Sequence, residues 1–118
     1  MAVDPIIRKR LKNNKAKGVA AEHRAAAIYG TQRYKANTGG PLDLFEFQGY
    51  HVQVKSGGTI TLGTIFEGLK AAQLAALPAG IGAVHVEYGR GGRLRHLICF
   101  DAMEFAAWNG FDKREEAA

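Results

Sequence analysis

An acidic residue followed ten positions later by an amide and an amine is the part of this sequence best suited to chemistry. Asp43 precedes Gln53, Val54 and Lys55 by this spacing. The Asp43 carboxylate, the Gln53 side-chain carbonyl and the Val54 main-chain carbonyl are oxygen ligands of the kind that Mg²⁺ prefers, with water and a phosphate oxygen completing the octahedron. Lys55 beside such an ion would orient an attacking water or offset the charge that develops during phosphodiester hydrolysis. The pattern therefore predicts a metal and phosphate site.

A second carboxylate, Glu22, lies on the helix that the alanine-rich stretch 15–29 predicts. From that helix Glu22 can reach the same site, where it would bind the metal through water or add a second negative charge. Exposed polar residues at the edge of a sheet would produce the same spacing without any chemistry. On the residues alone, both interpretations stay open.

The pairing of two neighbouring strands decides whether these groups meet. A two-residue loop at Gln48-Gly49 would place Asp43 opposite Val54 and turn it away from Lys55. We therefore expect a three-residue loop over 48–50, or a β-bulge near Asp43, since either would bring Asp43 to the face of Lys55.

The elements that must position the site follow from periodicity and from turn residues. Side chains alternate along the stretch 50–55, which puts His51, Gln53 and Lys55 on one face and apolar residues on the other. Asp101 and Glu104 form a capping box for a closing helix. The first predicted helix covers 15–29, with Asn13 or Asn14 as its N-cap and Gly30 at its end. Three strands follow over 31–35, 42–47 and 50–55, and then a second helix over 64–77. The chain continues with a hairpin of strands over 81–88 and 93–100 and with a last helix that ends at Asn109-Gly110. This order predicts an α/β sandwich with a mixed five-stranded sheet between helices.

Length and composition restrict the class of protein. The 118 residues allow one domain, which we expect over 15–118 behind a flexible basic segment over 1–14. A single cysteine rules out an internal disulfide and a cysteine-ligated metal cluster. The sequence has no apolar run of membrane-spanning length, no secretory signal and no glycine-rich motif typical of a nucleotide site. We therefore expect a cytoplasmic protein that contacts no membrane and uses no nucleotide cofactor.

Positive charge is concentrated in the first 40 residues, which hold nine Lys or Arg and two acids, whereas the other 78 hold seven and nine. Such asymmetry is typical of a protein that binds a polyanion, and nucleic acid is the commonest one, although a solvated basic tail would look similar. The residues that we expect to contact nucleic acid are Arg8, Lys9, Arg10, Lys12, Lys15, Lys17, Arg33, Lys35, Thr38 and Ser56.

Three motifs over about residues 15–77 resemble a known family. They are Lys17-Gly18-x-x-x-Glu22, Thr38-Gly39-Gly40-Pro41-Leu42-Asp43 and Gln53-Val54-Lys55-Ser56. Together they resemble the PD-(D/E)xK nuclease superfamily, and within it most closely the archaeal-type and phage Holliday junction resolvases. The resemblance implies a restriction-endonuclease-like three-layer core with the order α-β-β-β-α-β-β-α. It also implies that Glu22, Asp43 and Gln53 bind Mg²⁺, for which Mn²⁺ can substitute, and that Lys55 assists phosphodiester hydrolysis.

The resemblance further implies a homodimer that cuts four-way DNA junctions, located in the host cytoplasm if a phage encodes it. The aromatic residues Phe105, Trp108 and Phe111 are candidates for the dimer surface, although core packing would explain them equally well. Gln53 departs from the family pattern, which has an acid there, and this removes one negative charge from the metal site. Two alternatives therefore remain: a general or restriction-type DNA endonuclease on the same fold, and a catalytically inactive nuclease-like protein that binds DNA.

Overall fold

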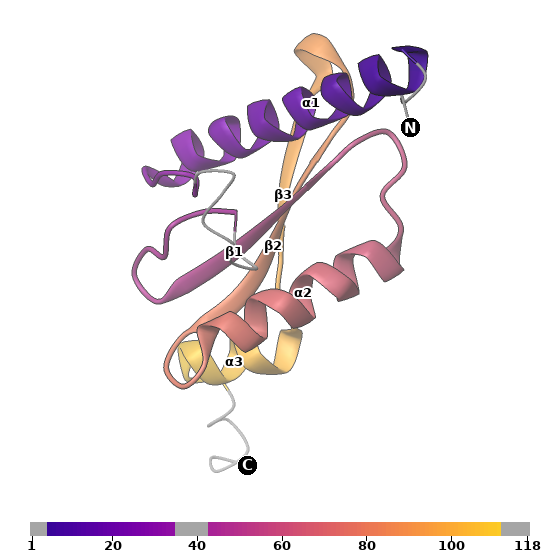
Figure 1. Ribbon diagram of the computed structural model, residues 1–118. Coiled ribbons are helices and arrows are strands. Elements are labelled where there is room, and N and C mark those ends of the chain that lie inside the picture. The colour runs from indigo at the N-terminus through magenta and orange to yellow at the C-terminus, as the bar shows by residue number, and fades with distance from the viewer. Residues whose placement is uncertain (1–4, 35–42, 112–118) are drawn as a thin grey trace.

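Three α-helices and three strands make up the described part of the chain, which is residues 5–34 and 43–111 of a computed structural model (Figure 1). In chain order these elements are α1 (Pro5–Tyr29), β1 (Tyr50–Ser56), α2 (Leu62–Ala76), β2 (Ile81–Tyr88), β3 (Arg95–Cys99) and α3 (Ala102–Asn109), with a short 3-10 helix at Gly91–Arg93. The sheet has the order β1-β2-β3, with β1 parallel to β2 and β3 antiparallel to β2. The predicted α/β class with a mixed sheet is confirmed.

The sheet lies between α1 and α2, as Figure 1 shows. Because β1 and β2 are parallel, α2 forms the crossover connection between them. Alternation along β2 then supplies both faces: Ala83 packs with α1, whereas Val84 and Val86 pack with Leu69 of α2. This arrangement explains why every residue of β2 up to Glu87 is buried.

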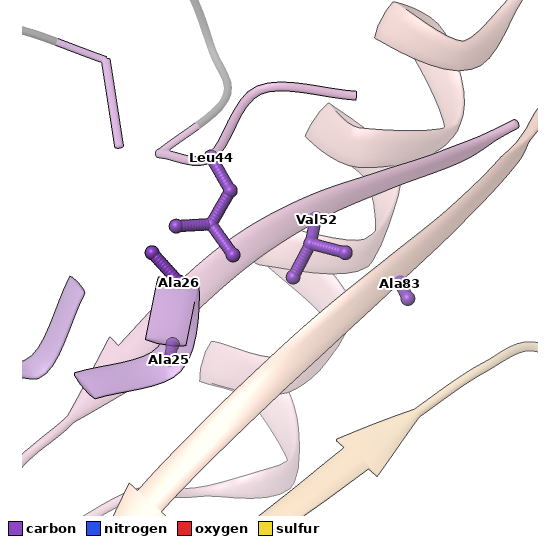
Figure 2. Close-up of a cluster of buried hydrophobic side chains, with 5 residues drawn as sticks. All are labelled: Ala25, Ala26, Leu44, Val52 and Ala83. Atoms are coloured by element: carbon purple, nitrogen blue, oxygen red, sulfur yellow. The ribbon is translucent and has the colours of Figure 1, made fainter. Parts of the chain in front are cut away.

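The core beneath α1 is built mainly from small residues (Figure 2). Ala25 and Ala26 of α1 meet Val52 of β1, Ala83 of β2 and Leu44 from the segment before β1. Leu44 and Val52 are fully buried, and each contributes about 1.5–3 kcal/mol relative to an exposed side chain. Because these helix residues are alanines, α1 lies close to the strands. Longer side chains on the same face of α1 can therefore contact residues of the sheet.

On the other face, Gly82 lets α2 approach the backbone of β2. A Cβ atom at Gly82 would lie 2.4 Å from the backbone nitrogen of Gln73 and 2.6 Å from the carbonyl carbon of Ala72. Both atoms belong to helix backbone, which cannot rotate away as a side chain can. The spacing of α2 and β2 therefore depends on glycine at this position.

The helix ends follow the predicted signals in two cases. Asp101 is the N-cap of α3 and accepts a hydrogen bond from the Glu104 backbone N–H at 3.0 Å, while Gly110 ends the helix with φ of 78°. Gly30, with φ of 68°, follows the last residue of α1. The helix predicted over 64–77 is confirmed as α2, with its N-cap at Thr61.

The predicted start of the first helix is wrong. The helix α1 begins at Pro5, so the predicted N-caps Asn13 and Asn14 lie inside it, as does the predicted boundary between a flexible segment over 1–14 and the domain. Proline is favoured in the first turn of a helix, and the residues between it and Gly18 are mostly good helix formers. Local propensity thus carries the helix through the basic segment.

The prediction of five strands is also wrong for the described residues. The stretches expected as the first two strands form one isolated antiparallel bridge between Arg33 and Leu44. Two backbone hydrogen bonds flank it, from Tyr34 N–H to the Asp43 carbonyl at 2.9 Å and from Phe45 N–H to the Gln32 carbonyl at 2.7 Å. Leu44 thus pairs with the segment after α1, and residues 43–46 add no strand to the sheet. The predicted hairpin of β2 and β3 is confirmed, with β3 two residues shorter at its start and one residue shorter at its end.

Candidate active site

The turn before β1 is a two-residue loop, which contradicts the predicted three-residue loop or bulge. Phe47 and Tyr50 exchange backbone hydrogen bonds of 3.2 Å and 2.9 Å across Gln48 and Gly49. Both loop residues have positive φ, 52° and 86°, as a type I′ turn requires. Trp108 of α3 lies against Gly49, 2.7 Å from where a Cβ would be, and so favours glycine there.

Asp43 nevertheless reaches the strand that carries Lys55. The Val54 N–H donates a hydrogen bond of 2.7 Å to Asp43 Oδ2. Because residues 43–46 do not continue the pairing with β1, the Asp43 side chain is not confined to one face by strand alternation. In an extended strand the N–H and C=O of one residue point to the same side, so the Val54 carbonyl also faces the Asp43 side of β1.

The electrostatic surroundings of Asp43 identify its neighbours. Burial is the largest influence and raises the pKa of the Asp43 carboxyl, whereas the hydrogen bond from Val54 lowers it. The charge of Glu22 and a hydrogen bond with its carboxyl raise the pKa further, and the charge of Lys55 lowers it. The structure therefore places Asp43 on the Val54 N–H at the outer edge of β1 with Glu22 beside it, and Lys55 is close enough for its charge to act on Asp43.

Arg33 completes this cluster from the segment after α1. Its Nε donates to Glu22 Oε2 at 2.7 Å, and less than a fifth of either side chain is exposed. The sequence predicted that Arg33 contacts nucleic acid; the structure places it against the Glu22 carboxylate. A cation thus balances one of two neighbouring carboxylates.

Gln53 and Lys55 lie on the face of β1 that packs against α2, as the alternation predicted. A Cβ atom at Gly68 of α2 would lie 3.0 Å from Lys55 Cε, 3.2 Å from Val84 Cγ2 and 3.6 Å from Gln53 Cγ. The absence of a side chain at Gly68 thus leaves room for the stem of Lys55 between strand and helix. The sequence analysis did not predict a role for Gly68. A glycine inside an otherwise regular helix often marks a close contact, and this was the available signal.

Gly68→Ala is expected to slow any reaction that depends on the Lys55 amine by about tenfold, because a small displacement of a reacting group is costly. Stability should change little, since alanine gains about 1 kcal/mol of helix propensity that offsets the crowding. Gly63→Ala is the matched control, because its Cβ would have one ordinary contact, 3.7 Å from Thr61 Oγ1. Equal cleavage rates for both variants would contradict this role of Gly68.

The donor set suits a hard divalent cation. The carboxylates of Glu22 and Asp43 and the main-chain carbonyl of Val54 are oxygen ligands, and a bound cation would relieve the repulsion that Glu22 exerts on Asp43. Within the part of the chain that the structure describes, no group of three or more His, Cys, Asp and Glu side chains is arranged to hold a metal ion. A site at Asp43 would therefore rely on carbonyl oxygen and water as well as on Glu22.

An open groove of about 1040 Å³ shares Val54 and Lys55 with this site, although neither Asp43 nor Glu22 lines it, and it is bordered by residues of α1. Positive side chains come from three elements: Lys17 and Arg24 from α1, Lys55 from β1 and Arg90 from the turn between β2 and β3. The remaining lining residues are Gly18, Val54, Ser56, Gly57, Gly58, Glu87, Gly89 and Leu94. Of the ten residues predicted to contact nucleic acid, Lys17 and Ser56 line this groove. Arg8, Lys9, Arg10, Lys12 and Lys15 lie upstream on α1, and Lys35 and Thr38 lie outside the described residues.

A second polar cluster crosses from α1 to the sheet, and the sequence analysis did not predict it. Arg24 pairs with Glu87, whose Oε2 lies 3.8 Å from His96 Nδ1. The His96 ring is hydrogen-bonded to His85 at 2.9 Å, and His85 is hydrogen-bonded to the Tyr29 hydroxyl. His85 and Glu87 are two residues apart and lie on one face of the buried strand β2. Polar residues within an apolar strand were the signal in the sequence that could have indicated a buried polar cluster.

The stability of the fold should fall in mild acid because of His85. Burial, followed by the charge of His96, lowers the pKa of His85 to about 4, and Glu87 opposes this shift. The unfolded chain therefore takes up a proton near pH 6.5 that the folded protein refuses, so about 2 kcal/mol of stability is lost between pH 7 and pH 5. Urea unfolding of the native protein and of His85→Gln, which cannot titrate, checks this. Parallel acid losses in both proteins would contradict the assignment.

The described helices include none that is both long and apolar enough to cross a membrane. No protein-family model matches the chain, and searches of the curated proteins and of the solved structures find no significant match.

Proposed function

We propose that this protein is a Mg²⁺-dependent DNA endonuclease that hydrolyses phosphodiester bonds, with four-way junctions as its preferred substrate. The observation that carries the proposal is the Asp43 carboxylate on the Val54 N–H, beside Glu22 and Lys55. Two acids, a carbonyl and an amine at one strand edge are the groups that metal-assisted hydrolysis of a phosphodiester needs. The motif resemblance and the groove of positive side chains support the same function.

Each residue of the site then has a defined task. Asp43, the Val54 carbonyl and Glu22 would hold the metal, with Gln53 as a further oxygen donor from the same strand. When bound, Mg²⁺ polarises the phosphate and lowers the pKa of water. Lys55 places its ammonium where negative charge develops on the phosphate oxygens. The low exposure of Glu22 and its pairing with Arg33 keep that carboxylate oriented.

The DNA backbone would follow the groove from Lys55 toward the turn between β2 and β3. Lys17 and Arg90 on its two sides can neutralise phosphates, and backbone N–H groups of the segment 56–58 can hydrogen-bond to them. The basic residues upstream on α1 would extend this contact. The described fold has helices on both faces of a mixed sheet, which is the order of layers that a restriction-endonuclease-like core requires.

A homodimer would supply two sites for the two strands of a junction. Phe105, Trp108 and Phe111 are each between about two-fifths and one-half exposed on and beside α3. Two of the rings also pack on the fold, since Trp108 contacts Tyr50 and Phe105 contacts Phe100. These partly exposed aromatic rings are therefore available for association without loss of their contacts in the core.

The test is cleavage of an end-labelled four-way junction beside a linear duplex of the same arm sequence. Each substrate is incubated with Mg²⁺, with Mn²⁺ and with chelator, and with the native protein, Lys55→Ala and Lys70→Ala. Lys70 is exposed on α2 and does not line the groove, so its variant controls for the loss of a positive charge. We expect metal-dependent symmetric cuts in the junction, lost in Lys55→Ala and retained in Lys70→Ala.

Three other outcomes separate the alternatives. Equal cleavage of junction and duplex would indicate a general or restriction-type endonuclease. Tight DNA binding without cleavage would indicate an inactive nuclease-like protein, which the amide at Gln53 in place of an acid favours. Neither binding nor cleavage would overturn the proposal.

A further inference from the structure

Arg24 and Glu87 form a two-point ion pair on the wall of the groove. Arg24 Nε donates to Glu87 Oε2 at 2.7 Å, and Arg24 Nη2 donates to Glu87 Oε1 at 2.6 Å. The Glu87 side chain is 4% exposed, whereas that of Arg24 is 44% exposed. The carboxylate therefore belongs to the interior, and the guanidinium faces the groove.

This geometry fixes the plane of the guanidinium and leaves its other edge for a ligand. A guanidinium has five N–H groups, of which the pair with Glu87 uses one on Nε and one on Nη2. The N–H groups of Nη1 and the second N–H of Nη2 form an edge that matches two oxygens of a phosphate. Arginine held in this way loses little further conformational freedom when it binds.

The surroundings of Glu87 keep it ionised and in place. The hydrogen bond from Arg24 is the main reason that the pKa of Glu87 is lowered, and His96 and His85 act in the same direction. The cluster behind Glu87 continues through His96 and His85 to Tyr29 on α1. This connection ties the orientation of Arg24 to the packing of α1 on the sheet.

The groove also explains why a buried carboxylate on β2 is paired with an exposed arginine. Burying Glu87 is costly, and an apolar residue would fill the same place at least as stably. Arg24 lies among three other cations of the groove, Lys17, Lys55 and Arg90, and Glu87 is the one acid lining it among the described residues. The ion pair thus fixes the orientation of Arg24, whereas the other cationic side chains that line the groove have no such partner in the part of the chain that the structure describes.

We propose that Arg24 binds a backbone phosphate of the DNA in this groove, and that Glu87 is a positioning residue which orients the Arg24 guanidinium. This phosphate would be close along the DNA backbone to the phosphate that is hydrolysed at Asp43 and Lys55. Val54 and Lys55 belong both to that site and to the groove. The inference rests on the proposed function for the identity of the polyanion. Its chemistry, two-point recognition of a phosphate, is specific to Arg24 and does not involve the metal.

The test measures binding of a fluorescent four-way junction in chelator, where no cleavage occurs, at several salt concentrations. Arg24→Lys keeps the charge but loses the planar fork, so we expect about tenfold weaker binding with the salt slope unchanged. Arg24→Ala should bind more weakly still and lower the salt slope by about one, because one phosphate contact is lost. Arg95→Lys, on the exposed start of β3 outside the groove, is the matched control and should bind as the native protein does.

Glu87→Gln separates positioning from folding. With Mg²⁺ present we expect a raised KM and an unchanged kcat, because the Arg24 contact is impaired and the site at Asp43 is not. If Glu87→Gln unfolds, the comparison of Arg24→Lys with the native protein still tests the role of the guanidinium, because the Arg24 side chain is partly exposed. Lowered melting temperatures with native affinity in both Arg24 variants would show a purely structural pair and overturn the inference. A native protein that cleaves the junction while every Arg24 variant binds normally would overturn the inference alone, and a native protein that does not bind DNA would overturn the proposed function as well.

Discussion

Asp43→Asn is expected to abolish cleavage while raising the melting temperature of the metal-free protein. The asparagine retains an oxygen that can accept the Val54 N–H, so the local structure is kept. It removes a partly buried charge beside Glu22. Loss of a charged metal ligand should lower the cleavage rate on the order of a thousandfold. Calorimetry and single-turnover cleavage of the junction measure the two effects.

The sign of the stability change follows from the raised pKa of Asp43. The folded protein holds the Asp43 proton more tightly than the unfolded chain does, so stability is lost as pH rises from the usual pKa of aspartate through the raised value. Above that window the ionised carboxylate is destabilising, and Asp43→Asn should therefore be more stable than the native protein at pH 7. Mg²⁺ should stabilise the native protein and not the variant.

Glu67→Gln is the matched control, because Glu67 is an exposed acid on α2. It should leave the melting temperature, the response to Mg²⁺ and the cleavage rate close to those of the native protein. A cleavage rate for Asp43→Asn within tenfold of the native value would contradict the assignment of the metal site. An unchanged response to Mg²⁺ in that variant would contradict it independently of activity.

Gly82→Ala is expected to lower the free energy of unfolding by about 3 kcal/mol. The added Cβ would meet the backbone of Gln73 and Ala72 at less than 3 Å, so α2 must move away from β2 or the strand must distort. Urea denaturation should show a lower midpoint with an unchanged slope.

Gly92→Ala controls for the general effect of replacing glycine. Its Cβ would have no atom within 4 Å among the neighbours described, so its midpoint should stay within about 0.5 kcal/mol of the native value. Equal midpoints for the two variants would show that α2 and β2 are not held at the distance that the structure gives.

The parts of the fold predicted correctly are those whose signals are local. The hairpin of β2 and β3 follows from apolar runs around the glycine-rich turn, and the cap of α3 follows from Asp101 and Glu104. The face of Gln53 and Lys55 follows from alternation along one strand. In each case the residues that determine the structure are close together in the sequence.

The arrangement of residues around Asp43 could not be predicted from strand alternation. Strand alternation alone said that a two-residue loop would separate Asp43 from Lys55, yet the loop has two residues and the groups are neighbours. The difference arises because Asp43 replaces strand pairing with a side-chain hydrogen bond to Val54. Such a contact depends on where the segment 43–46 leaves the sheet, which no local pattern specifies.

The cluster around Glu87 shows the same limit for long-range contacts. Arg24 and Glu87 are 63 residues apart, and Tyr29 and His85 are 56 apart. The spacing of His85 and Glu87 on one face of β2 was visible in the sequence, but their partners on α1 depend on how the helix docks.

The contact between Asp43 and Val54 also protects the rim of the sheet. β1 is an outer strand, and an uncovered outer strand offers its N–H and C=O groups to any extended peptide. The Asp43 carboxylate accepts a hydrogen bond from the Val54 N–H, so this N–H is not available to another strand. It also places negative charge at the edge where a strand of another chain would pair with β1. The same side chain that we assign to the metal therefore discourages the sheet from growing into an aggregate.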